Sequence, residues 1–154
     1  MTIRFAGEAD IPGLLRLLHQ VGQVHHEIRP DIFRSGALKY DEAALAQLLR
    51  DENRPVFAAV EDGQVLGYCF CIRRSFGDSV MTSRKEIYID DLCVEEAARG
   101  RGIATALYRH VCAWAKEEGC AFITLNVWNG NNSAMAFYEK MGMKPRSITM
   151  DFPL

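Results

Sequence analysis

The stretch from Val94 to Leu107, VEEAARGRGIATAL, constrains the fold of this chain more than any other. It reads as the end of an apolar strand, a polar loop, two glycines beside arginines, and the start of a helix. N–H groups in the first turn of a helix lack intrahelical partners, and the helix dipole makes that end electropositive. Gly100 and Gly102 allow a ligand to approach the backbone closely. Arg99 and Arg101 add positive charge. The stretch predicts either a phosphate site or an ordinary helix start with two solvated arginines.

Hydrophobic periodicity divides the rest of the chain into strands and helices. Apolar runs predict strands at residues 2–6, 56–61, 64–73, 85–94, 121–127 and 147–152. Helical spacing predicts helices at residues 10–22, 41–50, 102–118 and 131–141, with an irregular segment at 25–35. Asp62-Gly63 is a strong signal for a two-residue hairpin turn. Antiparallel strands followed by a β–α–β unit favour an α/β (α+β) domain in which helices pack on a central mixed sheet.

Length and composition limit the function classes. A chain of 154 residues is expected to form a single domain, residues 1–154, with its own core. The formal net charge of −2 lacks the basic field that general nucleic-acid binding needs. No apolar run approaches the ~18 residues of a membrane span, and the first residues lack the apolar core of a signal peptide. The five cysteines have no framework spacing, so we expect reduced thiols in a cytoplasmic protein.

Two familiar phosphate loops do not fit residues 99–104. A Walker loop ends in Gly-Lys-Ser or Gly-Lys-Thr, whereas Gly102 is followed by Ile103 and Ala104. A dinucleotide loop reads GxGxxG and needs an acidic residue about 20 positions later on the next strand. The third glycine is absent here, and the acids near that distance, Glu117 and Glu118, lie at a predicted helix end.

A third kind of loop does fit. Residues 99–104, RGRGIA, resemble the Arg/Gln-x-x-Gly-x-Gly/Ala signature of the GCN5-related N-acetyltransferases, the GNAT superfamily. About thirty residues later, Asn131 to Met143, NNSAMAFYEKMGM, is similar to the second block of that family. The departures are Ala104 where glycine is common and Met143 where phenylalanine is common. The element order over residues 2–152 also resembles the family, which implies a mostly antiparallel sheet with one splayed strand pair.

The resemblance implies an acetyl-CoA-dependent N-acetyltransferase in which an amine attacks the thioester directly through a tetrahedral intermediate. Acetyl-CoA would lie between the splayed strands, with its pantetheine amides on the backbone of Leu92 and Val94 and its pyrophosphate on the loop. Asn131 would contact the cofactor, and Tyr138 would protonate the departing thiolate. The expected cofactor-binding residues are Leu92, Cys93, Val94, Arg99, Gly100, Arg101, Gly102, Ile103, Ala104, Asn131 and Tyr138. The alternatives are a capping role for Asn131 and a core role for Tyr138.

The base is predicted at Asp90, because an acid at this position serves polyamine acetyltransferases as base, often through water. Asp90 and Asp91 are neighbours on a strand, so we expect them to point to opposite faces and only one to reach the acceptor. A structural role is the expectation for Asp91. Glu86, His25 or a water chain are the alternatives for the base.

The irregular segment from His25 to Arg34 should help to form the acceptor site. We expect His25, Asp31 and Phe33, together with Asp90, to bind substrate, and no metal, because HExxH and a matching cysteine set are absent. The acidic pair favours a polyamine or another small cationic amine as the acceptor. A peptide N-terminus or lysine, or a non-catalytic acyl-CoA sensor, are the alternatives. Because members of the family often form dimers, the resemblance also points to a homodimer.

Overall fold

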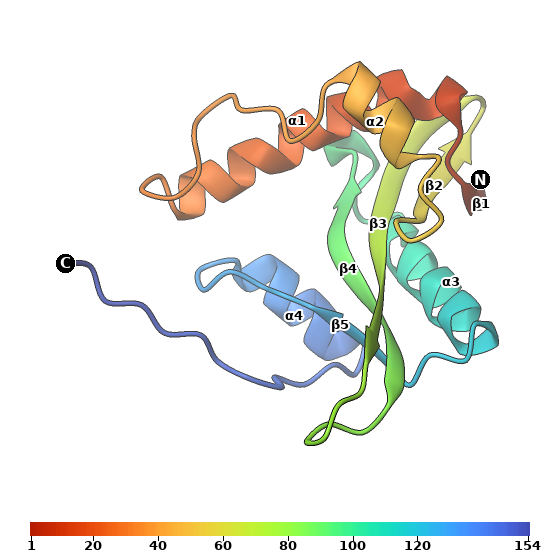
Figure 1. The fold of residues 1–154 in the computed structure, drawn as a ribbon. Coiled ribbons are helices and arrows are strands. Elements are labelled where there is room, and N and C mark those ends of the chain that lie inside the picture. The colour runs from red at the N-terminus through yellow and green to blue at the C-terminus, as the bar shows by residue number, and fades with distance from the viewer.

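A five-stranded sheet forms the centre of the computed structural model, which describes residues 1–154. Its strands lie in the order β1-β2-β3-β4-β5, with β5 parallel to β4 and every other pair antiparallel. The strands are β1 (Thr2–Phe5), β2 (Val56–Glu61), β3 (Gln64–Phe76), β4 (Arg84–Val94) and β5 (Phe122–Leu125). The helices are α1 (Ile11–Ile28), α2 (Glu42–Leu48), α3 (Ile103–Glu117) and α4 (Asn132–Lys140), with short 3-10 turns η1 (Glu8–Asp10) and η2 (Glu96–Ala98). The mixed sheet between helices confirms the predicted fold class (Figure 1).

Helices cover both faces of the sheet because β3 is apolar on both faces. Tyr68 and Phe70 belong to a core cluster with leucines of α1 and α2. Cys69 and Cys71 belong to a second cluster, with α3. Successive residues of a strand point to opposite faces, so this apolar run supplies both clusters at once. The two cysteines share one face, as their spacing predicts.

Helix α1 continues to Ile28, so the prediction that it ends near Gly22 was wrong. A Cβ at Gly22 would come within 3.3 Å of the carbonyl oxygen of Ala37. The glycine therefore lets the following segment approach the helix closely, at a cost in helix propensity of about 1 kcal/mol relative to alanine. Because the helix is longer, His25 lies in its last turns and not in an irregular segment.

Local turn and capping signals were read correctly. Asp62 and Gly63 have φ of 49° and 77°, the positive values that a two-residue type I′ turn requires between β2 and β3. The Asn131 side chain caps α4 by accepting a hydrogen bond from the N–H of Ala134 at 3.2 Å. Gly142, which follows the C-cap residue Met141 of this helix, has a positive φ of 91°.

The predicted strand at residues 147–152 is absent, so that prediction was wrong. Residues 147–154 make no backbone hydrogen bond, and Figure 1 shows them leaving the body as an extended segment beyond β5 and α4. A strand needs a neighbour for its N–H and C=O groups, and β5 pairs only with β4. Strand β5 is also shorter than the predicted 121–127.

Candidate active site

The candidate site lies where β4 and β5 part. Their pairing runs from Glu86 and Phe122 to Ile89 and Leu125 and ends there, although β4 continues to Val94. A cavity of about 500 Å³ opens at this point. Its walls come from α1, the segment after α1, the second half of β4, the residues after β5, and α4. The splayed strand pair expected from the resemblance is therefore present.

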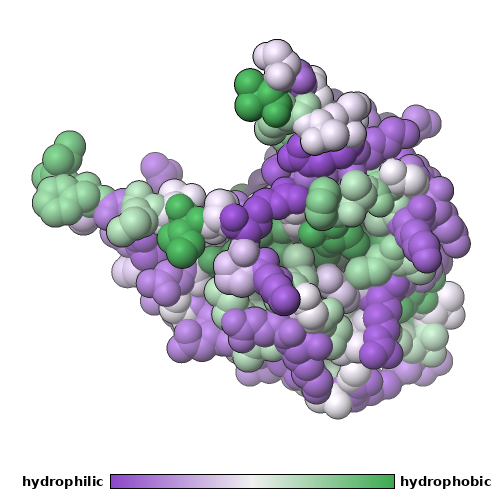
Figure 2. All heavy atoms as spheres, turned by 90° about the horizontal axis from the view of Figure 1, so that it is seen from below, coloured by the Kyte–Doolittle hydropathy of each residue, from purple (hydrophilic) through white to green (hydrophobic).

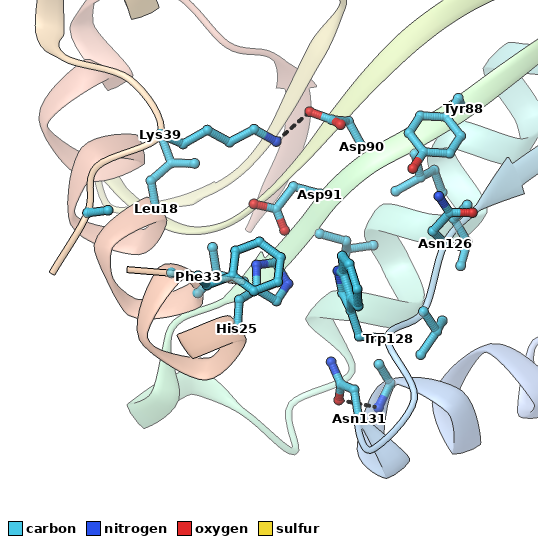
Figure 3. A pocket seen from close by; sticks show the side chains of 18 of the residues that line it. Leu18, His25, Phe33, Lys39, Tyr88, Asp90, Asp91, Asn126, Trp128 and Asn131 are labelled. Carbon is cyan, nitrogen blue, oxygen red and sulfur yellow. Dashed lines mark hydrogen bonds and ion pairs between the residues drawn. The ribbon is translucent and has the colours of Figure 1, made fainter. Parts of the chain in front are cut away.

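Asp90 and Asp91 both line this cavity, and in Figure 3 the Asp90 carboxylate points toward Lys39 and the Asp91 carboxylate toward His25 and Phe33. The expectation that they point to opposite faces was wrong because β4 carries a bulge. Ile89 pairs with Cys71 and Asp91 pairs with Phe70, so Asp90 is an extra residue without a partner in β3. A bulge interrupts the strict alternation of side chains. Two carboxylates therefore share one wall of the cavity.

The Asp90 carboxylate is held by a lysine from the segment after α1. Lys39 Nζ donates to Asp90 Oδ2 at 2.7 Å, and an Arg54 nitrogen lies 4.0 Å from the same oxygen. Burial alone would lower the pKa of Lys39, but its hydrogen bond and charge interaction with Asp90 raise the pKa above its ordinary value. No sequence signal marks Lys39, because this contact joins residues that are 51 positions apart.

The Asp91 carboxylate lies deeper and is held by the buried Tyr68, whose hydroxyl donates to Asp91 Oδ2 at 2.9 Å. Burial raises the pKa of Asp91, although the Tyr68 hydrogen bond and the charges of Lys39 and His25 act in the opposite direction. Burial, together with the Asp91 charge, also raises the pKa of Tyr68, which stays a neutral donor. The two acids thus differ in environment, Asp90 paired with a cation and Asp91 with a phenol.

Aromatic rings form another wall of the cavity. The rings of His25 and Phe33 lie 5.1 Å apart, and Phe33 meets Trp128 edge to face, also at 5.1 Å (Figure 3). His26 Nδ1 donates to the carbonyl oxygen of Phe33 at 2.7 Å and fixes the turn that carries this ring. The sequence did not predict Trp128 as a site residue. The one sequence feature that marks it is its position, a large aromatic residue in the polar run just after β5. Asp31 does not line the cavity, because its carboxylate pairs with Arg29 at the surface.

The glycine loop leaves a row of backbone donors free. Gly100 and Gly102 have φ of 79° and 78°, and a Cβ on either would meet no atom within 4 Å. The backbone N–H groups of residues 100–105 donate to no acceptor in the chain. Arg101 pairs with Glu61 at 2.7 Å, while Arg99 Nε lies 3.5 Å from the carbonyl oxygen of Val94. Ile103 is buried and anchors the start of α3, with Ala104 beside it. The loop fits a phosphate, because its open face presents donors and no side chain.

Tyr138 on α4 and Asn131, the N-cap residue of α4, both line the cavity. Tyr138 packs in an aromatic group with Tyr108 and Phe137, at ring distances of 6.2 and 5.1 Å. Burial, followed by nearby ionisable groups, raises the pKa of Tyr138 well above its ordinary value of 10, so the phenol is protonated at neutral pH. Asn131 uses its side-chain oxygen for the helix cap and lines the cavity as well.

Cys93 points away from the cavity. Leu92 lines it, whereas the Cys93 thiol lies in the core, 3.7 Å from the carbonyl oxygen of Leu17. Burial raises the pKa of the Cys93 thiol to about 12. Its side chain is therefore a packed strand residue, which leaves only its backbone for a ligand.

Glu86 lies outside the cavity, at the beginning of β4. Its buried carboxylate accepts hydrogen bonds from Arg84 at 2.6 Å and from Arg146 at 3.1 Å. Burial would raise its pKa, but the two arginines outweigh that effect and lower it.

The structure brings no three His, Cys, Asp or Glu side chains together in a metal-binding arrangement. None of its helices is both long and apolar enough to cross a bilayer.

Known proteins resemble the chain over most of its length. An uncharacterized N-acetyltransferase of Mycobacterium tuberculosis is 32% identical over 102 residues, which are 66% of this chain and 60% of that protein. The chain thus matches only about three fifths of that relative's length. The thialysine N-epsilon-acetyltransferase of Bos taurus is 27% identical, with 92% of this chain and 83% of that protein covered.

Among solved structures, a mutant of the BH1408 protein from Bacillus halodurans has a TM-score of 0.95 and 31% sequence identity. The match covers 100% of this chain and 99% of that one. The family model for the acetyltransferase (GNAT) family matches residues 22–143, which include the glycine loop and the second block. The chain therefore belongs to the GNAT acetyltransferase family.

Proposed function

We propose that this protein transfers an acetyl group from acetyl-CoA to the primary amine of a small cationic molecule. The observation that carries the proposal is the cavity at the parting of β4 and β5. That cavity reaches Asp90 and Asp91 on one wall and Tyr138 on another. Direct acyl transfer to an amine needs both a proton acceptor and a proton donor around the reacting atoms, and these side chains supply the two kinds of group.

The acetyl donor would bind along the cavity and the glycine loop. The free N–H groups of residues 100–105 would hold its pyrophosphate, aided by the dipole of α3. Beyond Ile89 the β4 backbone no longer pairs with β5, so Leu92 and Val94 would bond the pantetheine amides as an added strand does. Acetyl-CoA supplies the activated thioester, and membership of the GNAT family supports this choice of donor.

The cavity favours a small cationic acceptor over a peptide. Asp90 and Asp91 create a negative wall that attracts an ammonium group, and the rings of Phe33 and Trp128 would cover its alkyl chain. A cavity of about 500 Å³ matches a small molecule. The similarity to a thialysine N-epsilon-acetyltransferase over 92% of the chain supports the same class.

The proton transfers would use the two sides of the cavity. A primary amine has a pKa near 10 and must lose a proton before it attacks. We assign this proton to Asp90, directly or through water, because Asp91 is buried and already accepts the hydrogen bond from Tyr68, whereas the substrate ammonium could replace that of Lys39 on Asp90. Tyr138, a neutral phenol at physiological pH, would donate its proton to the departing thiolate.

The test is a thermal-shift titration with acetyl-CoA, followed by a thiol-release assay on a panel of di- and triamines, lysine analogues and peptides. We expect stabilisation by acetyl-CoA and turnover that is fastest with small cationic amines. Stabilisation without turnover on any amine would indicate a sensor, and no stabilisation would exclude the acyl-CoA site.

Asp90→Asn should lose more turnover than Asp91→Asn if Asp90 takes the proton. Equal turnover of Asp90→Asn and wild type would remove Asp90 as the base.

A further inference from the structure

The candidate cavity contains cations that the binding of a simple amine does not need. Its charged lining residues are two acids, Asp90 and Asp91, and two bases, Arg34 and Lys39. Like charges repel, so a polyamine alone would bind more tightly to a cavity without the bases. Hydrophilic residues are frequent on the face of the molecule in Figure 2, so an exposed base by itself indicates nothing. These two bases are distinctive because they line the same cavity as the acids.

Lys39 can leave Asp90 without leaving the cavity. No helix or strand lies between α1 and α2, and Lys39 belongs to this connecting segment. Its side chain is 44% exposed and carries the ammonium group on a flexible four-carbon stem. The hydrogen-bond partner of this ammonium group is Asp90, at 2.7 Å. A substrate ammonium on Asp90 would therefore leave the Lys39 charge in the cavity without a counter-charge, which is unfavourable.

Arg34 is a second cation of the cavity that has no acidic partner. Arg29, in the same segment, pairs with two acids, whereas no acid of the chain pairs with Arg34. The loop proposed for the pyrophosphate follows β4, beyond Val94, whereas Lys39 meets β4 within the strand, at Asp90. Lys39 therefore lies at the acceptor end of the site, and an anionic group that it binds would belong to the acceptor.

We propose that the acceptor carries a carboxylate beside its amines, as a diamino acid does, and that Lys39 selects this carboxylate. The selection depends on the proposed function, in which Asp90 receives the reacting amine. As the substrate ammonium replaces Lys39 on Asp90, the Lys39 ammonium passes to the substrate carboxylate, with Arg34 as the second cation. Neither Asp90 nor Lys39 is then left without a partner. A diamino acid carries one more positive than negative charge, so it is still a small cation.

The test compares acceptors that differ only in the carboxylate: lysine with cadaverine, and ornithine with putrescine. The KM and kcat of each are measured in the thiol-release assay for wild type, Lys39→Met and Arg34→Gln. For wild type we expect a kcat/KM about tenfold higher for each diamino acid than for its diamine.

Lys39→Met should raise the KM of lysine about tenfold and lower that of cadaverine, because it removes a partner from one acceptor and a competitor from the other. Arg34→Gln should raise the KM of lysine by a smaller factor and should not raise that of cadaverine. Lys39→Arg keeps a cation and should keep the preference for the diamino acids. Opposite shifts of two KM values in one variant cannot come from a loss of folding.

Three outcomes would overturn the selection. If wild type acetylates lysine and cadaverine with equal kcat/KM, the selection fails and the proposed function stands. If the KM of both acceptors falls in Lys39→Met, Lys39 only competes for Asp90 and does not bind the carboxylate. If acetyl-CoA stabilises the protein but neither kind of acceptor is acetylated, the proposed function fails and the selection fails with it.

Discussion

Lys39 Nζ lies 2.7 Å from Asp90 Oδ2, across the cavity wall that we propose for the amine substrate. The chain thus supplies its own ammonium group to the carboxylate that would receive the substrate. The lysine comes from the segment after α1, which approaches the helix closely at Gly22. A cationic acceptor would compete with Lys39 for the same oxygen.

Lys39→Met should therefore lower the KM for diamines about tenfold, which corresponds to ~1.4 kcal/mol. Methionine removes the competing charge and keeps a similar length. The measurement is the KM of cationic amines beside that of a monoamine without a second charge, in the thiol-release assay. Lys39→Arg keeps the ion pair and serves as the control. An equal KM for wild type and Lys39→Met with every diamine would show that Lys39 does not occupy the acceptor position.

Tyr138→Phe should lower kcat about 100-fold or more, the usual loss when a general acid is removed. The ring and its packing stay, so the affinity for CoA should change little. Turnover and CoA binding are measured across pH. Tyr108→Phe is the matched control, because Tyr108 contacts the Tyr138 ring but does not line the cavity. Wild-type kcat in Tyr138→Phe would remove the general-acid role.

Gly102→Val should abolish CoA binding, because a branched side chain would stand where the loop N–H groups are free. In the protein itself a Cβ at Gly102 meets no atom within 4 Å, so the clash would be with the ligand alone. The control is Gly119→Val, whose φ of 73° imposes a similar backbone strain, about 1–2 kcal/mol, at an open position outside the loop. If both variants bind CoA as wild type does in calorimetry, the loop does not hold the pyrophosphate.

Glu86→Gln should reduce the free energy of unfolding by about 2 kcal/mol, or roughly 4–8 °C in Tm, because it removes the charge between Arg84 and Arg146. The folded-state pKa of Glu86 is lowered from its ordinary 4.5, so its contribution is complete above that value and is lost as the pH falls through the folded-state pKa. The Tm difference between wild type and variant should thus shrink in acid. A difference that is constant from pH 7 to pH 3 would contradict the ion pair's role. Turnover below Tm should persist, since Glu86 lies outside the cavity.

The sequence predicted the parts of the site that depend on local backbone. The two glycines, the cap at Asn131 and the tyrosine two helical turns later are short-range patterns, and each has the predicted conformation or place. It failed at Asp90 and Asp91, because a bulge depends on how β3 pairs with β4. It also failed at Gly22, which reads as a helix end but lies inside α1, where a distant carbonyl approaches it.

The sequence by itself determined most of the strands and helices, the glycine loop and the family, because these follow from periodicity and from motifs within short stretches. Only the tertiary structure decided that both carboxylates face the cavity, that Lys39 reaches Asp90, and that Phe33 meets Trp128. These contacts join segments far apart in the chain, and their geometry depends on strand register and helix packing. The Val94–Leu107 stretch folds as predicted because its conformation depends on its own residues. Residues 147–154 have the pattern of a strand, but a strand forms only where a neighbouring strand pairs with it.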